Sequence, residues 1–567
     1  MVSALWLMTG AVIAQERHEP APDTIFYNGK VVTVDSTFSV QEAFAVKDDK
    51  FWAVGSTEQV RALAGPHTVL VNLEGHTVIP GLIDAHNHQY RAASLLLRGV
   101  DVVGVKSLAE LLRRIHQAAL VVPPGQTVYT TAGWDQQDFP EKRPPTRQEL
   151  DSVAEGHAVI VQTTRGNAYA NTTALQGLKI TRETKTFVGF PVVKDASGEP
   201  TGWLKAPVGP AVPQGLQQAT SVLIPPPTQE EKEQLIVRMQ EQQNALGLTS
   251  IRELWLTPEV MRAYQDLRRE NKLTIRVSMG VTAFGSTHPD DLATTLKTWG
   301  VGTNFGDHWL KLDCVGELQT DGSYDNAYLR EPFANQPNYS GALFGTTTPE
   351  NLQRLISLVK KYDWRPATHI WGDKGLDVVL DAYEAADPSH ETIHSMRWTV
   401  EHALLVHPDQ LDRLERMGVL VSAQAQPYYL AKEMINAWGE KRANAAEPLR
   451  ELLDHHLIVG TGSDWPSLPN NPFVNFYFDV TRNTPAGPLG VAEKITREEA
   501  LRMATISNAY LTFEENVKGS IEANKLADFL ILSQDIMTVP AEQIPAILPL
   551  ATYVGGKKAF SAKDGGF

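Results

Sequence analysis

Strand-like and helix-like segments alternate along most of this chain, and that alternation restricts the fold more than any other feature. Eight short apolar segments are typical of buried strands, and segments with helically spaced Leu and Ile, such as 349–362 and 408–417, lie between them. This order is typical of parallel α/β folds, and eight strands predict a (β/α)8 barrel of the TIM type. The expected strands are 79–88, 249–252, 275–278, 308–312, 367–369, 398–402, 419–423 and 457–460.

Two regions do not follow this alternation. Residues 101–227 are rich in Pro, Gly, Thr and Gln, and we interpret them as a long insertion after the first barrel strand, of the kind that often forms a lid or binds substrate. Short β segments near both ends of the chain predict a small β-sandwich-like domain built from the two termini. We therefore expect a β domain at 23–79 plus 515–567 and a barrel at 80–514.

Candidate catalytic side chains gather at the expected carboxyl ends of the strands, where barrel enzymes carry their chemistry. His86 and His88 end the first strand, and two imidazoles on one face of a strand can bind a single metal ion. Taken singly, each histidine could be an ordinary buried residue and an aspartate could be a helix N-cap. The shared position at strand ends favours a metal site instead. The other candidates in such positions are Lys311, His369, His402 and Asp464.

Composition narrows the class of protein. The 567 residues include 66 acidic and 51 basic side chains, and a net charge of −15 disfavours sequence-independent binding to nucleic-acid phosphates. Cys314 is the only cysteine, which excludes an intramolecular disulfide and a cysteine-based zinc finger. We expect a small-molecule substrate and no nucleic-acid partner. Exposed barrel helices often support a homodimer, which we expect here as well.

The first residues indicate export. Residues 4–14 are apolar, and Val12 and Ala14 precede Gln15 as they would at a signal-peptide cleavage site, so 1–14 is a candidate signal peptide. This predicts a periplasmic or secreted protein. Because no Lys or Arg precedes the apolar run, a cytoplasmic protein with an unstructured leader is the alternative. No later stretch has eighteen uninterrupted apolar residues, so no stable membrane span is expected.

Five motifs together resemble the amidohydrolase superfamily, in its YtcJ-like branch that includes N-substituted formamide deformylases. The resemblance covers about residues 23–558, and its motifs are specific for the superfamily but poor guides to substrate. The motifs are Pro80-Gly81-Leu82-Ile83-Asp84-Ala85-His86-Asn87-His88, Thr368-His369-Ile370-Trp371-Gly372-Asp373, Val400-Glu401-His402-Ala403, Gly462-Ser463-Asp464-Trp465-Pro466 and Gly519-Ser520-Ile521-Glu522.

The resemblance implies a site for one or two divalent ions, typically zinc. It implies that His86 and His88 hold one ion, that two further histidines, His369 and His402, hold the other, and that a carboxylated Lys311 bridges them. The metal would activate water for attack on a carbonyl. Asp464 would act as metal neighbour and proton shuttle. For the lysine, an ion pair with Asp313 or Glu317 is the alternative.

Several positions depart from the pattern of the branch. Where relatives often have a His-Asp pair after the second strand, this chain has Arg252-Glu253, so that Glu253 could be an extra ligand, Arg252 could bind an anionic substrate, or the two could form an ion pair. Asn167 stands where relatives often place a histidine near the substrate. Trp134 could line the pocket, although a tryptophan that closes the core of the insertion is the commoner outcome.

These features predict a metal-dependent hydrolase of a non-peptide carbon–nitrogen bond, with N-acyl or N-formyl amines as the first candidates. An esterase or lactonase would use the same activated water. A deaminase of related type often has a glutamate three residues beyond the fifth-strand histidine, where this chain has Gly372. The alternative outside enzymes is a ligand-binding protein without turnover, although binding alone has no need of a proton shuttle such as Asp464.

Overall fold

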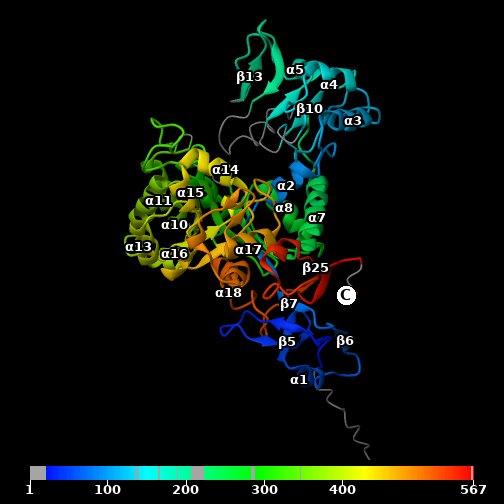
Figure 1. Cartoon of the computed structure of the whole chain (residues 1–567), viewed down its shortest axis with the longest axis vertical. Helices are drawn as coiled ribbons and strands as arrows, with labels where there is room; N and C mark the ends of the chain where they lie inside the picture. The colour runs from blue at the N-terminus through cyan, green and yellow to red at the C-terminus, as the bar shows by residue number, and fades with distance from the viewer. Residues whose placement is uncertain are drawn as a thin grey trace, which may run out of the picture.

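The computed structural model describes residues 21–567 except 135, 137–138, 164–166, 188–189, 206–222, 283–287, 345–346 and 564–565. The candidate signal segment, residues 1–14, lies outside the described residues. Figure 1 shows three bodies along the long axis of the molecule: a β domain at the bottom, a barrel in the middle and the insertion at the top.

A parallel sheet of eight strands, neighbours in chain order, forms the centre of the molecule. The segment after the last strand returns to the first, because Asp464 N donates to the backbone oxygen of His86 at 2.8 Å and Trp465 forms a parallel bridge with Asn87. The sheet is therefore nearly closed, which confirms the expected barrel. Its strands are β8 (Leu82–Asn87), β15 (Leu248–Leu256), β16 (Arg276–Val281), β17 (Leu310–Gln319), β18 (Pro366–Ile370), β19 (Thr399–His402), β20 (Leu420–Ala423) and β21 (Val459–Thr461).

Helices surround the sheet and cover its apolar outer face. Leu310 and Leu312 of β17 belong to one large buried cluster with Leu352 and Ile356 of α10, as expected where strand side chains of one parity pack outward on helices. Thr348 begins α10 by accepting a hydrogen bond from Asn351 N. The helices are α2 (Gln89–Leu96), α7 (Gln229–Ala245), α8 (Pro258–Arg269), α9 (Pro289–Trp299), α10 (Pro349–Lys361), α11 (Asp373–Ala386), α12 (Glu391–Met396), α13 (Pro408–Met417), α14 (Gln426–Trp438), α15 (Glu440–Asn444), α16 (Leu449–Asp454), α17 (Pro472–Thr481), α18 (Arg497–Arg502) and α19 (Asn508–Leu511).

Strands from both ends of the chain build the β domain. Its two sheets have the orders β5-β4-β1-β6 and β26-β25-β24-β7-β2-β3, and β24 pairs with β7, which leads directly into barrel strand β8. Aromatic rings fill the space between the sheets, with Phe26 stacked on Phe44 and Phe529 stacked on Tyr553. The strands are β1 (Thr24–Tyr27), β2 (Lys30–Val32), β3 (Val40–Gln41), β4 (Ala43–Lys47), β5 (Lys50–Gly55), β6 (Val69–Asn72), β7 (Thr77–Pro80), β24 (Phe529–Leu532), β25 (Pro549–Val554) and β26 (Lys557–Ser561). We propose 23–79 plus 515–567 as the bounds of this domain.

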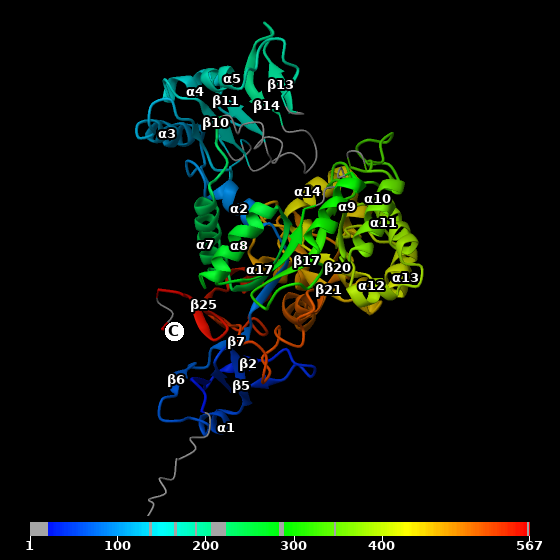
Figure 2. The same ribbon diagram turned by 180° about the vertical axis from the view of Figure 1, so that it is seen from behind.

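The insertion has a sheet and core of its own. Its sheet has the order β12-β13-β14-β11-β10-β9. Figures 1 and 2 both place it beyond the end of the barrel at which β8 leads into α2, which is the end where the strands have their carboxyl termini. The elements are α3 (Leu108–Ala119), β9 (Val128–Tyr129), α4 (Arg147–Val153), β10 (Val159–Gln162), β11 (Ala168–Ala170), α5 (Thr172–Gly177), β12 (Thr186–Phe187), β13 (Phe190–Lys194) and β14 (Pro200–Leu204).

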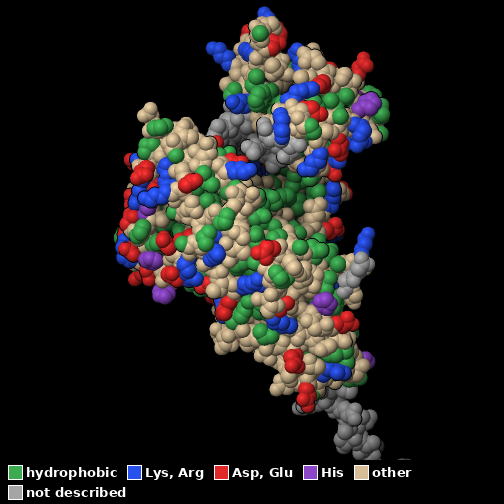
Figure 3. All heavy atoms as spheres, viewed as in Figure 1, with side chains coloured by type: hydrophobic (Ala, Val, Ile, Leu, Met, Phe, Trp, Pro, Cys, Tyr) green, Lys and Arg blue, Asp and Glu red, His purple; other side chains and the backbone are tan. Residues whose placement is uncertain are grey.

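The outer surface of the barrel carries charges of both signs. Arg413 of α13 pairs with Asp381 and Glu384 of α11, and Figure 3 shows acidic and basic side chains mixed over this flank of the molecule. Within the described part of the chain, no helix is both long enough and apolar enough to span a bilayer.

Candidate metal centre

Six side chains with metal-binding atoms meet at the carboxyl ends of five barrel strands. They are almost completely buried, and the most accessible is the Asp464 side chain, which is 13% exposed. Five of the six were expected from the sequence, and Glu317 was not. The set is His86 and His88 at the end of β8, Glu317 in β17, His369 in β18, His402 at the end of β19 and Asp464 after β21.

The first half of the cluster is formed by His86 and His88. Their Nε2 atoms lie 3.5 and 3.8 Å from Oε2 of Glu317, and 3.8 and 3.5 Å from Oδ1 of Asp464. Both Nε2 atoms are buried without a hydrogen-bond partner among the described residues. A buried polar atom without a hydrogen-bond partner calls for an explanation. Because both Nε2 atoms lie near the carboxylates of Glu317 and Asp464, they are well placed to bind one ion together.

The opposite ring nitrogens of these histidines are each held by an acceptor. Nδ1 of His86 lies 2.8 Å from Oε2 of Glu401, and Nδ1 of His88 lies 3.3 Å from the backbone oxygen of Leu254. A proton on Nδ1 satisfies each contact and leaves the lone pair of Nε2 directed at the cluster. This is the arrangement in which metal-binding histidines are usually fixed.

The second half is formed by His369 and His402 around the other oxygen of Glu317. Oε1 of Glu317 contacts Nδ1 of His369 and lies 2.9 Å from Nε2 of His402. Nε2 of Gln426 lies 2.6 Å from Nδ1 of His402, and turning the amide by 180° would put its oxygen, which has no other partner in the part of the chain that the structure describes, in place to accept the Nδ1 proton. One nitrogen from each histidine and one oxygen of Glu317 lie within 4.8 Å of one another.

Glu317 thus stands between the two pairs of histidines with one oxygen toward each. Burial alone would raise its pKa, but the nearby His86 and His369 hold the pKa well below its usual range, so the group is a carboxylate. Burial lowers the pKa of His369, yet Glu317 outweighs that effect and raises it to about 9. A site that binds a proton this firmly is one that attracts a positive charge.

The donor set fits a divalent cation. Imidazole nitrogens and carboxylate oxygens are the ligands that zinc takes in catalytic sites, and the geometry offers three such donors around each of two positions that share Glu317. The Nε2 atoms of His86 and His88, which have no hydrogen-bond partner within the described residues, support the binding of a divalent cation independently of the charge on Glu317.

Lys311 does not belong to this cluster, and the expectation that it bridges two metals is corrected here. It is the second residue of β17, whereas Glu317 lies six residues further along the strand toward the carboxyl end. The Lys311 ammonium contacts the backbone oxygen of Thr512 and lies 3.5 Å from Oε2 of Glu514. The strand was expected to end at Leu312 and instead continues to Gln319, which moves its carboxyl end to Glu317.

Arg252 does not reach a substrate site but forms ion pairs inside the barrel. It is fully buried, its Nε donates to Asp313 at 2.6 Å, and its Nη1 donates to Oε1 of Glu401 at 2.6 Å. Asp313 also pairs with Arg365. The alternative in which Arg252 pairs with Glu253 does not apply, because Glu253 accepts backbone hydrogen bonds from Gln89 and Tyr90. Glu401 links the Arg252 network to Nδ1 of His86.

Glu253 holds the beginning of helix α2 rather than a metal. Its carboxyl oxygens accept hydrogen bonds from the backbone N–H groups of Gln89 and Tyr90, which directly follow His88. Burial raises the pKa of Glu253 to about 8, although these hydrogen bonds oppose the shift. The residue therefore fixes the helix that follows the His88 ligand position.

Trp134 and Asn167 lie in the insertion. Trp134 is 2% exposed and stacks on Phe139 with ring centroids 5.1 Å apart, as part of the insertion's own core. Oδ1 of Asn167 accepts a hydrogen bond from Nε1 of Trp203 at 3.0 Å. Neither contact connects them to the six-residue cluster, so their assignment as substrate contacts stays a prediction.

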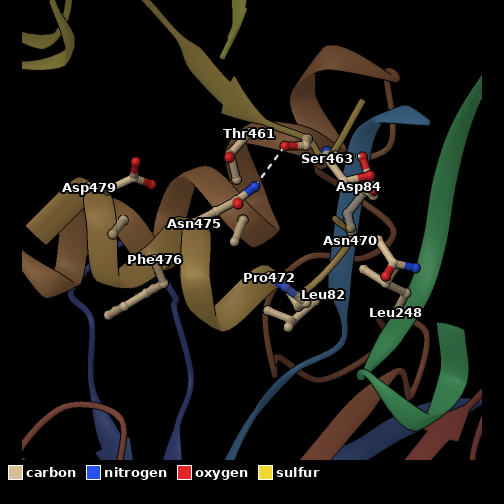
Figure 4. Close-up of a pocket in the computed structure, with 14 residues that line it drawn as sticks. Leu82, Asp84, Leu248, Thr461, Ser463, Asn470, Pro472, Asn475, Phe476 and Asp479 are labelled. Carbon is tan, nitrogen blue, oxygen red and sulfur yellow. Dashed lines mark hydrogen bonds between the residues drawn. The ribbon is translucent and has the colours of Figure 1, made fainter. Parts of the chain in front are cut away.

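Asp84 ties together the two segments that carry His86 and Asp464. Its oxygens accept from His86 N at 3.0 Å, from Ser463 N at 3.0 Å and from Ser463 Oγ at 2.6 Å. Figure 4 shows Asp84 and Ser463 beside a small pocket lined by residues of β8, β21 and α17. In this pocket the side chain of Asn475 donates a hydrogen bond to the backbone oxygen of Gly462. That pocket has a volume of about 20 Å³, enough for roughly one water molecule and too small for a substrate.

Comparison with known proteins relates most of the chain to one family. Residues 69–560 match the sequence profile described as "Amidohydrolase family". The N-substituted formamide deformylase of Arthrobacter pascens is 27% identical over 552 residues, which is 94% of this chain and 97% of that protein. The putative amidohydrolase YtcJ of Bacillus subtilis is 25% identical, over 94% of this chain and 98% of that protein.

A solved structure shares the same architecture. An uncharacterised metal-dependent hydrolase from Pyrococcus furiosus superposes with a TM-score of 0.72 and 26% identity, over 91% of this chain and all of that one. The similarity therefore extends over nearly the whole of both chains.

Proposed function

From the premise that this chain belongs to the amidohydrolase family and is a metal-dependent hydrolase, we propose that it cleaves the carbon–nitrogen bond of an N-acyl or N-formyl amine that is not a peptide. The observation that carries this proposal is the placement of Asp464 beside two unpartnered imidazole nitrogens and across from Glu317. The full-length similarity to a formamide deformylase favours a small acyl group.

The residues that would hold the metal are the four histidines, Glu317 and Asp464, and we propose zinc, as one ion or two that share Glu317. When bound, a divalent cation supplies Lewis acidity, which activates water and polarises a carbonyl. The protein itself keeps the ligand nitrogens deprotonated on the cluster side through Glu401 and the Leu254 oxygen.

Asp464 is suited to move the proton. Burial alone would raise its pKa, but the nearby imidazoles of His88, His86 and His402 lower it, so Asp464 starts as a carboxylate. As an anion it can take a proton from the attacking water and return it to the departing nitrogen. It is also the most accessible member of the cluster, which places it next to any substrate that enters.

The experiment is metal analysis with hydrolysis assays on wild type, Asp464→Asn and His86→Ala, using a panel of N-formyl amines, N-acetyl amines, esters and lactones. We expect metal in the wild type, reduced metal in His86→Ala, and a loss of turnover of at least about 100-fold in Asp464→Asn, as for a proton-transfer residue.

The matched control is Lys311→Met, which removes a buried ionisable group of the same barrel at a distance from the cluster and should keep both metal and turnover. Full turnover in Asp464→Asn would contradict the proposed mechanism, and turnover of esters alone would contradict the proposed bond.

A further inference from the structure

Arg91 is a basic side chain next to the candidate metal centre that the proposed mechanism does not use. It lies in the first turn of α2, three residues after His88, and is partly exposed. His88 directly precedes this helix as its N-cap residue, so Arg91 lies within one turn of the His88 ligand position. Glu253 anchors the beginning of this helix through two backbone N–H groups, which fixes the position of Arg91 relative to His88.

The guanidinium has no ionic partner in the described part of the chain. Its packing contact is with the ring of Trp255, whose centroid lies 5.5 Å away. The same ring stacks on His88 with centroids 4.2 Å apart and an angle of 22° between the planes. Trp255 therefore joins the ligand histidine and the arginine into one packed unit.

The position of Arg91 is unfavourable for the fold by itself. A cation in the first turn of a helix opposes the helix dipole. Burial lowers the pKa of Arg91, and the nearby Asp464 and Glu317 oppose that shift. A bound divalent cation would balance the charge of these two carboxylates, which leaves the positive charge of Arg91 without a counterion at the site.

We propose that Arg91 binds a carboxylate of the substrate, so that the preferred substrates are N-acyl amino acids rather than uncharged N-acyl amines. The inference rests on the proposed function and specifies its substrate class. A guanidinium binds a carboxylate through two parallel hydrogen bonds, and here it does so within one helical turn of a metal-ligand position. If the substrate carries its carboxylate on the carbon atom bonded to the scissile nitrogen, binding of that carboxylate to Arg91 would place the scissile carbon–nitrogen bond at the metal cluster.

The test compares two substrates that differ only in the carboxylate. N-formyl-leucine, as both enantiomers, and N-formyl-isopentylamine are assayed with metal-loaded wild type, Arg91→Gln, Arg91→Lys and the control Arg61→Gln. Arg61 also lies over an aromatic ring, that of Tyr27, but belongs to the β domain.

We expect Arg91→Gln to lower kcat/KM for N-formyl-leucine by roughly 10- to 100-fold, mainly through KM, which is the range for a lost charged hydrogen-bond pair. The value for N-formyl-isopentylamine should change less than about threefold. Arg91→Lys should recover part of the loss, because lysine keeps the charge but not the paired hydrogen bonds. Arg61→Gln should behave as wild type.

Equal losses on both substrates would overturn the proposal, because Arg91 would then only balance charge or support the fold. No loss on either would overturn it as well. If wild type hydrolyses neither substrate, the proposed function fails, and calorimetric binding of leucine and N-formyl-leucine decides the role of Arg91 separately. Binding weakened 10-fold or more in Arg91→Gln would support carboxylate recognition, and no binding to wild type would refute it.

Discussion

The substitution Glu401→Gln tests whether the buried network below the cluster controls metal binding. Glu401 is fully buried; one oxygen faces Nδ1 of His86 at 2.8 Å, and the other accepts from Arg252 at 2.6 Å and Thr399 at 2.9 Å. All three partners are donors when His86 carries its proton on Nδ1. Glutamine offers only one oxygen, so its amide nitrogen must face either His86 or Arg252.

Either orientation has a cost that can be estimated. If the amide nitrogen faces His86, the imidazole proton moves to Nε2, and that atom can no longer bind a metal. If it faces Arg252, two donors meet in a buried site. Loss of an outer hydrogen-bond partner typically weakens metal affinity about 10- to 100-fold, and breaking a buried ion pair costs about 3–5 kcal/mol of stability.

The assay is zinc titration against a competing chelator, with thermal unfolding of the same samples. The control is Glu514→Gln, because Glu514 is also buried and pairs with Lys311 and Lys518. We expect both variants to unfold at lower temperature and only Glu401→Gln to lose zinc affinity. Wild-type affinity in Glu401→Gln, or an equal loss in Glu514→Gln, would refute the reasoning.

Three further predictions follow from the buried groups. Burial raises the pKa of Glu253 to about 8 from an ordinary value of 4.5, so between these values the folded chain holds a proton that the unfolded chain has released, and this stabilisation is lost as pH rises from 4.5 through 8. The unfolding temperature of wild type should therefore fall relative to that of Glu253→Gln between pH 5 and 9. A constant difference between the two unfolding temperatures would contradict this. Glu317→Gln should reduce bound metal by at least about 10-fold, and equal metal content in Glu317→Gln and wild type would show that the carboxylate is not a ligand. Trp134→Ala should destabilise the insertion by about 3–5 kcal/mol through lost core packing, measured as faster proteolysis within 101–227, while zinc affinity stays unchanged.

The sequence predicted the barrel well because its strands are buried on both faces and separated by regular helices. All eight expected segments overlap barrel strands, and the resemblance to the amidohydrolase family is confirmed by the match over residues 69–560. The two histidines of β8 could be paired from spacing alone, since side chains two apart share a strand face. Export and a homodimer remain predictions.

The bridging position was assigned wrongly because it depends on where β17 ends. A short apolar segment that includes Lys311 and Leu312 looks like a complete strand, and the following Gly316 looks like a break. The observed strand has ten residues and irregular pairing near Asp313 and Glu317, so simple alternation does not identify its inward side chains. Continued apolar positions at Val315 and Leu318 were the signal that the strand extends to Glu317.

The role of Arg252 was missed for a different reason. Its partners Asp313 and Glu401 lie on strands far apart in the chain, and no local pattern shows that they meet. Buried ion pairs inside a barrel depend on which strands face each other across its interior, and this is known only once the sheet closes.

The most direct test is anomalous X-ray diffraction, at the zinc edge, from crystals of the zinc-loaded protein. The account predicts at least one peak about 2.0–2.2 Å from Nε2 of His86, Nε2 of His88 and an oxygen of Glu317, with Lys311 unmodified and still beside Glu514. A peak held by a carboxylated Lys311, or no peak at the histidine cluster, would contradict it.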